Sequence, residues 1–346
     1  MIKNNDFSGK LLQWYRLNHR NLPWRNTENP YHIWLSEIIL QQTRVSQGLA
    51  YYVKFVENFP TVKKLAEASE EKVLRLWQGL GYYSRARNLH SAAQTVVNDY
   101  GAEFPKTYKE LLKLKGVGEY TAAAVASFAY KEIIPVVDGN VFRVLSRIFG
   151  LKDDISMLKS KKVFQDLASL LIPNDKPDLF NQAIMEFGAL QCKPKSPDCT
   201  VCVFNDVCFA NQNGLVTAFP VKTKKVKVKT RYFHYYLIRY REKIIFKIRP
   251  EGDIWQHLFE PYLIEVKNEF QNPRELLLAK LKFTNITRSL KPVKHVLTHR
   301  IIYAYFHHVE LSKDEYDLVK DDFSFSSDEE IESLPKPILI ANYLSS

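Results

Sequence analysis

The chain has 346 residues, of which 46% are hydrophobic and 25% are charged, and its formal net charge is +11. At roughly 150 residues per domain, this length favours about two domains, each with its own core. The composition excludes a disordered or collagen-like chain. No apolar run reaches the ~18 residues of a membrane span, and the opening MIKNNDFSGK has no secretory signal, so we expect a soluble, cytoplasmic protein.

The positive charge is distributed unevenly along the chain. A positive surface attracts polyanions, so nucleic acid is the first expected partner and an anionic membrane the second. Residues 221–231 carry six basic residues and no acid, whereas residues 310–332 carry ten acids and two lysines. We therefore expect the first of these segments to face phosphate, and we do not expect this of the acidic one.

The N-terminal part of the chain, over residues 7–210, has apolar residues at the three-to-four spacing that is typical of helices. This spacing predicts helices over Ile33–Leu40, Val73–Leu80, Ala122–Phe128, Val141–Ile148, Val163–Leu171 and Phe180–Leu190. The breaks between them carry residues that start or stop helices: Asn29-Pro30, Gly101, Gly116, Pro135, Gly150 and Pro173.

The pattern of apolar residues changes from residue 220 onward. β-Branched and aromatic residues with partial alternation predict strands over 232–240, 243–248, 262–266 and 300–311, with one helix near Arg274–Leu281. The expected organisation is an all-α domain over 1–212, a basic linker over 213–230 and a smaller α+β domain over 231–346. Within the first domain we place a helix–hairpin–helix at about 110–130 and a cysteine-containing loop at 192–208.

A tight turn, Gly116-Val117-Gly118, lies between two helical patterns. Glycines at such a junction let the backbone turn sharply and leave the N–H groups of the next helix free. These N–H groups and the helix dipole form an anion site. The carbonyl groups of Leu112, Leu114 and Val117 are candidates for holding a monovalent cation that bridges to phosphate.

Two carboxylates are candidates for chemistry. Glu37 lies among apolar residues of its predicted helix, where an unpaired carboxylate is costly unless it is neutral. A carboxyl group that is kept protonated there would be a general acid. Asp138 precedes the helical pattern over 139–149, which is typical of an N-cap. This capping role is compatible with an ionised carboxylate that is held rigidly beside a substrate.

All four cysteines, Cys192, Cys199, Cys202 and Cys208, fall in the spacing C-x6-C-x2-C-x5-C. In a chain without an export signal the thiols are expected to be reduced and free to bind a metal. Zinc and a [4Fe–4S] cluster are both open. Only one tight C-x2-C pair is present, so the wide gaps favour iron–sulfur over zinc. Lys193 and Lys195 lie inside the first gap, which favours a structural, DNA-positioning role over electron transfer.

Several motifs together resemble those of the MutY-type adenine DNA glycosylases, within the endonuclease III-like helix–hairpin–helix superfamily. The resemblance is carried, besides the cysteine loop, by LPWR (22–25), WLSEIILQQT (34–43), GLGYYSRARNLH (79–90), LKGVGEYTA (114–122) and VVDGNVFRVLSR (136–147). It runs from about Trp14 to Cys208 and continues more weakly to the end. It implies a mainly α fold, a helix–hairpin–helix DNA glycosylase with a [4Fe–4S] loop, followed by a smaller α+β Nudix-like domain that recognises 8-oxoguanine.

The resemblance also implies an activity, which is the removal of adenine paired with 8-oxoguanine or guanine in double-stranded DNA during base excision repair. The adenine would be flipped out of the duplex. Glu37 would protonate adenine, and Asp138 would stabilise the oxocarbenium-like sugar. Tyr120 and Asn140 match further catalytic positions. The remaining matches are to positions that contact the base or the DNA: Arg25, Gln42, Thr43, Leu80, Tyr82, Gly116, Gly118, Thr298 and His299.

The second domain departs from the family pattern in two respects. The family's Phe-Ser-His recognition motif is Leu297-Thr298-His299 here, so one hydroxyl and the histidine are kept. The segment around Arg274-Glu275-Leu276 lacks the paired glutamates that would bind magnesium, so we do not expect pyrophosphate hydrolysis. By the resemblance we expect a monomer that acts on the bacterial nucleoid and binds no membrane.

Two other functions compete with this interpretation. An endonuclease III-like glycosylase/lyase is disfavoured because Tyr120 stands where bifunctional relatives carry a Schiff-base lysine. The extra domain after Cys208 also disfavours it. A non-catalytic DNA-binding protein with a redox-sensing cluster would leave Glu37, in its apolar setting, without a role.

Overall fold

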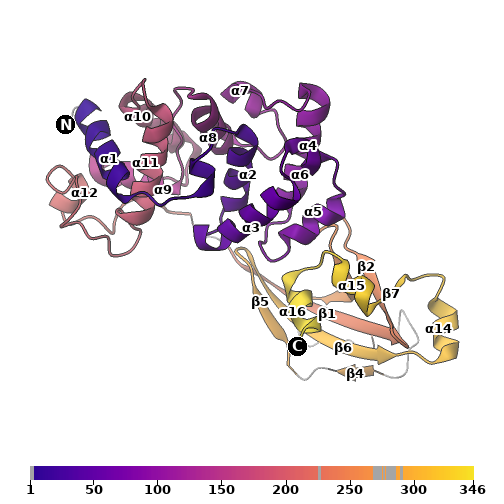
Figure 1. The fold of residues 1–346 in the computed structure, drawn as a ribbon. Helices are drawn as coiled ribbons and strands as arrows, with labels where there is room; N and C mark the ends of the chain where they lie inside the picture. The colour runs from indigo at the N-terminus through magenta and orange to yellow at the C-terminus, as the bar shows by residue number, and fades with distance from the viewer. Residues whose placement is uncertain (1–3, 225–226, 268–274, 276, 278–285, 289–290) are drawn as a thin grey trace. The chain divides into compact units, whose positions relative to one another are not determined.

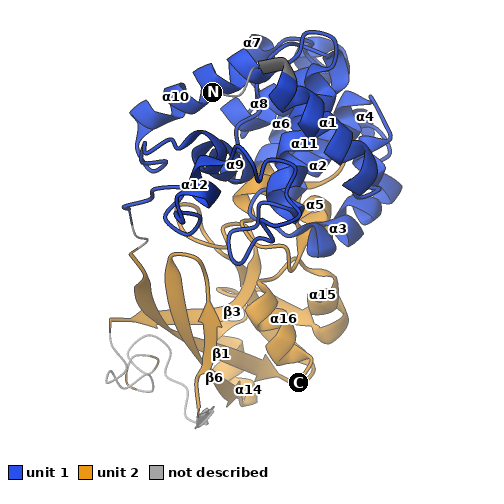
Figure 2. Cartoon of the chain, turned by 90° about the vertical axis from the view of Figure 1, so that its left-hand side faces the viewer, with its two compact units in different colours: residues 1–67, 88–224 blue, residues 68–87, 225–346 orange. Residues whose placement is uncertain are grey.

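The computed structural model describes residues 4–224, 227–267, 275, 277, 286–288 and 291–346 (Figure 1). The chain folds as two compact units, the first made of residues 1–67 and 88–224 and the second of residues 68–87 and 225–346 (Figure 2). The first is helical and the second is built on a sheet. The predicted fold class, a mainly α domain followed by a smaller α+β domain, is confirmed. The predicted sequence boundaries at 212 and 231 stay a prediction.

Most helices lie in the first unit. They are α1 (Asn4–Asn18), η1 (Pro23–Arg25), α2 (Pro30–Leu40), α3 (Val45–Asn58), α4 (Val62–Ala66), α6 (Ser84–Tyr100, which begins in the second unit), α7 (Tyr108–Leu111), α8 (Glu119–Tyr130), α9 (Gly139–Phe149), α10 (Leu158–Leu171), α11 (Pro177–Leu190) and α12 (Phe209–Gln212). Every described helix is too short or too polar to traverse a lipid bilayer.

One predicted helix was placed too far along the chain. The apolar pattern over Val73–Leu80 predicts a helix to residue 80, but α5 (Glu70–Trp77) ends three residues earlier. Gly79 and Gly81 adopt φ angles of 96° and 75°, in the left-handed region that a right-handed helix cannot contain. The chain therefore leaves α5 through a glycine-rich turn that carries Leu80 and Tyr82.

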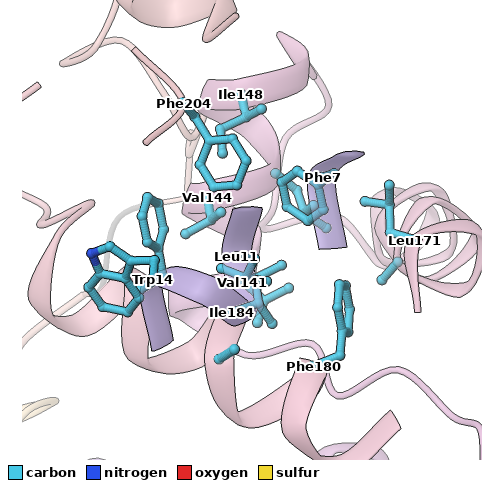
Figure 3. Packing of buried hydrophobic residues seen from close by; sticks show 14 of the residues in the cluster. Phe7, Leu11, Trp14, Val141, Val144, Ile148, Leu171, Phe180, Ile184 and Phe204 are labelled. Carbon is cyan, nitrogen blue, oxygen red and sulfur yellow. The ribbon is translucent and has the colours of Figure 1, made fainter. Parts of the chain in front are cut away.

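The core of the first unit holds α9 in place. Figure 3 shows Phe7 and Leu11 of α1 packed with Val144 of α9 and with residues of α11 and the cysteine loop. The rings of Phe7 and Phe204 stack at 4.9 Å between centroids. Burial of each large apolar side chain contributes roughly 1.5–3 kcal/mol. This packing fixes the helix whose N-terminus carries Asp138.

The second unit is built on a mixed sheet with the strand order β4-β6-β1-β3-β2-β7, in which β1 and β6 pair in parallel and β5 pairs with β6. The strands are β1 (Lys229–Tyr240), β2 (Lys243–Ile248), β3 (Phe259–Val266), β4 (Ile286–Arg288), β5 (Val293–Val296), β6 (Arg300–Glu310) and β7 (Phe325–Ser327). The four predicted strands are confirmed as β1, β2, β3 and β6. The helix predicted near Arg274–Leu281 lies largely outside the described residues.

Three short helices follow the sheet strands in the C-terminal segment: α14 (Lys313–Val319), α15 (Asp328–Ser333) and α16 (Ile338–Leu344). Tyr343 of α16 stacks on Phe306 of β6 with 3.6 Å between ring centroids and hydrogen-bonds to His308 at 2.7 Å. The end of the chain is thereby packed against the central strands.

Candidate active site and DNA-binding surfaces

Glu37 is buried on α2, with 6% of its surface exposed. The helix begins cleanly because Asn29 accepts a hydrogen bond from the N–H of Tyr31 and Pro30 occupies the first turn. Seven of its other residues are also buried, so the carboxyl group has little contact with water. Burial raises the pKa of Glu37 from its ordinary 4.5 to about 7, and the nearby Asp138 charge acts in the same direction.

Tyr120, in the first turn of α8, contacts Glu37 directly. Its hydroxyl donates a hydrogen bond of 2.6 Å to Glu37 Oε2. Burial raises the pKa of Tyr120 well above 10, so the phenol keeps its proton and remains a donor. This bond lowers the pKa of Glu37, but burial has the larger effect and the net pKa stays raised. The hydrogen bond from Tyr120 thus orients the Glu37 carboxyl group, and burial keeps much of it in the protonated, uncharged form near pH 7.

Asp138 is the N-cap of α9. Its Oδ1 accepts hydrogen bonds from the backbone N–H groups of Asn140 (2.9 Å) and Val141 (2.8 Å), and its Oδ2 accepts one from Asn140 Nδ2 (2.7 Å). Burial raises the pKa of Asp138, while these three bonds and Arg143 lower it. The predicted N-cap role of Asp138 suggested an ionised carboxylate. The structure shows that burial also opposes its ionisation. The carboxylate nevertheless has fixed donors on both oxygens.

Both carboxyl groups open onto the same space. A cavity of about 560 Å³ is lined by Glu37, Tyr120 and Asp138. The same three residues also line a wider groove of about 940 Å³. These volumes lie in the range of about 300–1,000 Å³ that holds small ligands. The acid and the carboxylate therefore share a cleft that admits a group the size of a nucleobase.

A buried ion-pair cluster forms part of the wall of the 560 Å³ cavity. Arg25 Nη2 lies 2.7 Å from Glu186 Oε2, and Arg20 binds both carboxylate oxygens at 2.8 and 2.6 Å. Although burial opposes it, pairing with the two arginines holds the pKa of Glu186 at about 2. The guanidinium of Arg25 is thereby fixed at the cavity.

Arg143 joins the cysteine loop to the site. Its guanidinium donates to the side-chain oxygen of Asn140 (2.8 Å) and to the carbonyls of Gly188 (2.6 Å) and Cys192 (2.7 Å). Because Asn140 in turn donates to Asp138, one chain of hydrogen bonds runs from the backbone of the first cysteine to the catalytic candidate.

The four cysteines line one small cavity of about 20 Å³. Arg147 lies against it, with its guanidinium 3.4 Å from Cys192 Sγ and its carbonyl accepting from Cys208 Sγ at 3.4 Å. In the described part of the chain, no three His, Cys, Asp or Glu side chains form a group that could hold a metal ion. The four thiols nonetheless line one cavity, and four thiols are a donor set for either a zinc ion or an iron–sulfur cluster.

The two glycines of the hairpin, Gly116 and Gly118, have different structural roles. Gly116 has a φ of 77°, and a Cβ there would lie 2.6 Å from Asn88 Cβ, so both conformation and space demand glycine. Gly118 is the N-cap of α8 and offers no side-chain acceptor to the first N–H groups. Both glycines line the 940 Å³ groove, where these N–H groups are available to an anion.

Two of the residues predicted to contact the base or the DNA have strained backbones. Gln42 and Tyr82 have φ angles of 55° and 48°, in a region that non-glycine residues rarely adopt. Such strain gathers at functional sites. Gln42 lines the 940 Å³ groove of the first unit and Thr43 the 560 Å³ cavity.

The second unit holds the other predicted DNA contacts. Leu297 and Arg300 exchange backbone hydrogen bonds, so Thr298 and His299 form the two-residue turn between β5 and β6. A hydrogen bond joins the hydroxyl groups of Tyr82 and Thr298. A cavity of about 580 Å³ in this unit is lined, among others, by Leu80, Tyr82, Thr298 and His299.

Comparisons with known proteins agree with this architecture. The HhH-GPD superfamily of base excision DNA repair proteins matches residues 35–171, and a NUDIX domain matches residues 234–346. The adenine DNA glycosylase of Buchnera aphidicola subsp. Schizaphis graminum is 34% identical over 73% of this chain and 73% of its own length. The chain belongs to the adenine DNA glycosylase family. The human adenine DNA glycosylase is 42% identical over 60% of this chain and 39% of its own.

Solved structures resemble part of this family member. A thermostable thymine-DNA glycosylase aligns with a TM-score of 0.56 and 31% identity, over 61% of this chain and 97% of its own. An endonuclease III in a non-covalent DNA complex aligns with a TM-score of 0.51 and 23% identity, over 62% and 99%, which supports the fold alone. The family is one of DNA-binding hydrolases of base excision repair, and the predicted enzyme class is confirmed.

Reasoning from the sequence missed two residues of this site, Glu186 and Arg143. Glu186 lies between Met185 and Phe187 on an apolar helix, which is the same signal that singled out Glu37. Arg143 belongs to the VVDGNVFRVLSR motif, but its contacts depend on Gly188 and Cys192, which are distant in sequence.

Proposed function

We propose that the chain hydrolyses the N-glycosidic bond of adenine paired with 8-oxoguanine or guanine in duplex DNA, and that it does not cut the strand. The observation that carries this proposal is the shared cleft, which is lined both by a carboxyl group with a pKa of about 7 and by a capped aspartate. A glycosidic bond needs an acid for the leaving group and an anion for the sugar, and the two carboxyl groups meet these needs.

The adenine must leave the duplex before it reaches this cleft, at a cost of a few kcal/mol of lost stacking. Gln42 and Tyr82, whose backbones are held in the left-handed region, enter the vacated stack, and Leu80 assists them. Thr43 is a further DNA contact. The N–H groups that follow Gly118 bind a phosphate of the flipped strand. A monovalent cation on the carbonyls of Leu112, Leu114 and Val117 would reinforce this contact.

In the cleft, protonated Glu37 gives its proton to adenine N7, which makes the base a good leaving group. Such acid catalysis is worth roughly 10²–10⁴-fold. The C1′–N9 bond breaks, and Asp138 stabilises the positive charge on the sugar. Asn140 holds the Asp138 oxygens, while Tyr120 holds the acid and Arg25 orients the base. Water then adds to C1′ and completes the hydrolysis.

The opposite base is read by the second unit. The hydroxyl pair of Tyr82 and Thr298 offers a donor and an acceptor beside the 580 Å³ cavity, and His299 lies in the same turn. These groups suit the edge of a purine. We assign 8-oxoguanine or guanine as their ligand, in keeping with the NUDIX match over residues 234–346.

The four cysteines would hold a [4Fe–4S] cluster, which would organise the loop that presents Lys193 and Lys195 to phosphate. The position of Arg147 supports this, because its guanidinium lies 3.4 Å from Cys192 Sγ and would offset the negative charge of a thiolate-bound cluster. We further propose that the protein is a monomer that acts on the bacterial nucleoid in the cytoplasm.

A single-turnover assay tests the function. Duplexes with adenine opposite 8-oxoguanine are incubated with enzyme in excess and analysed with and without alkali. We expect strand breaks only after alkali. Direct breaks would favour a glycosylase/lyase, and binding without excision would favour a non-catalytic DNA-binding protein. The variants Glu37→Gln and Asp138→Asn serve as controls, because each should lose excision and keep duplex affinity; loss of binding in both would indicate misfolding.

The absence of strand cutting is tested separately at Tyr120. A lysine in this position would place an amine where the phenol now contacts Glu37, and an amine can attack C1′ and form a Schiff base. We expect Tyr120→Lys to produce alkali-independent cleavage and a product that borohydride traps. Tyr120→Phe is the matched control and should give neither; trapping with Phe would place the nucleophile elsewhere.

A further inference from the structure

The 940 Å³ groove of the first unit has a contributor that the proposed mechanism does not use. Besides the hairpin and the catalytic candidates, Lys161, Gln165 and Ser169 of α10 line it. These residues are four apart in sequence, so they lie on one face of the helix. Phe164, Ala168 and Leu171 anchor the same helix in the core. The lining face of α10 is therefore held rigidly.

The polar groups on this face differ in their availability. The hydroxyl of Ser169 donates to the carbonyl of Gln165 at 2.8 Å, so its proton is already used. Lys161 is exposed and forms no ion pair with any carboxylate of the described residues. Its ammonium and the Gln165 amide are thus the donors that α10 offers to the groove.

The charges around the groove make Lys161 important. Glu37, Glu119 and Asp138 all line the groove, whereas Lys161 is the one cation among the described lining residues. A phosphodiester in this groove would be repelled by any ionised carboxylate at short range. The hairpin N–H groups form an anion site for one phosphate, and a positively charged side chain on another wall of the groove offsets the repulsion along the rest of the strand.

We propose that α10 forms a second phosphate-binding wall of this groove, in which Lys161 pairs with a backbone phosphate of the adenine-bearing strand and the Gln165 amide donates to the same strand. The inference rests on the proposed function, because the groove contains the Glu37–Asp138 pair at which that strand would deliver its adenine. It is continuous with the anion site at Gly118, so one strand can contact both.

The test compares Lys161→Ala with Lys162→Ala. Lys162 is the next residue of the same helix, is also exposed, and does not line the groove. Dissociation constants are measured over a range of salt concentrations, for a duplex with adenine opposite 8-oxoguanine and for a fully paired duplex. One lost phosphate contact reduces the slope of log K against log salt by about 0.9, which is about an eightfold loss of affinity at 0.1 M salt.

We expect this loss in Lys161→Ala on both duplexes and no comparable loss in Lys162→Ala. Lys161→Arg should retain the wild-type slope, and Lys161→Glu should weaken binding further. Equal slopes for the two alanine variants would overturn the proposal. Because the wild-type protein is assayed for excision separately, failure of the proposed function would be seen independently of the slopes.

Discussion

Burial makes the ionised form of Glu37 costly to the stability of the fold. Its folded pKa of about 7 lies above its ordinary 4.5, so the folded state binds the proton more tightly than the unfolded state does. This contribution to stability is complete below pH 4.5 and is lost as the pH rises through 7. Above pH 7 the ionised, buried carboxylate destabilises the fold by up to about 3 kcal/mol.

We therefore predict that Glu37→Gln is more stable than the wild type at pH 8 and inactive. The amide is neutral at every pH and can still accept the hydrogen bond from Tyr120. Thermal unfolding should show a higher midpoint for the variant at pH 8 and little difference at pH 5. A variant that is less stable at pH 8 would mean that Glu37 is not buried as an ionised group.

The same pKa predicts the pH dependence of excision. If protonated Glu37 is the acid, the single-turnover rate should fall about tenfold per pH unit well above pH 7. It should fall again in acid, where Asp138, whose pKa burial also raises, becomes protonated. The two apparent pKa values in this profile belong to Glu37 and Asp138 together, because their titrations are coupled. In Glu37→Gln, the residual excision rate should no longer fall as the pH rises above 7. If that fall persists, another group is the acid.

Two of the four catalytic candidates were predictable from their residue types, whereas Tyr120 and Asn140 were assigned from the family resemblance. A carboxylate in an apolar helix and an aspartate before a helix are local patterns, and these singled out Glu37 and Asp138. The ion pairs of Glu186 were not predictable in this way, because Arg20 and Arg25 lie more than 160 residues away in sequence. The sequence shows that Glu186 needs a partner but does not show which residue it is.

At the level of elements, α9 and α11 approach each other closely at the site. Gly188 of α11 permits this, since a Cβ there would lie 2.6 Å from Asn140 Cβ and 3.1 Å from its Cα and carbonyl oxygen. Asn140 sits between Asp138 and Arg143 in the hydrogen-bond chain. The spacing of the two helices thus sets the position of the Asp138 carboxylate.

We predict that Gly188→Ala reduces the excision rate by roughly 10²-fold, because a shift of about 1 Å at a catalytic group has an effect of this size. Duplex affinity should change little. The rate is measured in single turnover, with Gly9→Ala as the control. A Cβ at Gly9 of α1 would meet nothing within 4 Å, so that variant should excise at the wild-type rate. A wild-type excision rate in Gly188→Ala would show that α11 can shift away from α9 without displacing Asp138.

The sequence predicted some helices and strands better than others. Alternating aromatic and β-branched residues identify β1 and β6 because a half-buried strand needs that pattern. The helices of the acidic C-terminal segment lack a long apolar face, and sequence periodicity does not reveal them. Membership of 68–87 in the second unit depends on distant contacts, such as His257 with Glu70 at 2.6 Å and Arg87 with the carbonyl of Gln256 at 2.9 Å. Local pattern carries no information about such contacts.

Across the whole molecule, the net charge of +11 is not all available to DNA. Arg231, the last basic residue of the 221–231 segment, pairs with Asp253 at 2.6 Å and with Glu265 at 2.5 Å. Lys222 and Lys227 of the same segment are exposed and form no ion pair with described residues. The charge that can contribute to binding is therefore smaller than the formal count suggests, and it includes Lys222 and Lys227 of this segment.

We predict that replacing Lys222 and Lys227 together with alanine lowers the slope of log K against log salt by about 1.8, if each contacts one phosphate. The matched control replaces Lys313 and Lys320, which changes the net charge equally. Both of these lysines pair with Asp317, at 2.7 and 3.1 Å, within the acidic segment 310–332. Their removal should leave the slope unchanged. If both double variants flatten the slope alike, net charge governs affinity and the basic segment has no special contact with DNA; if neither does, the segment only links its neighbours.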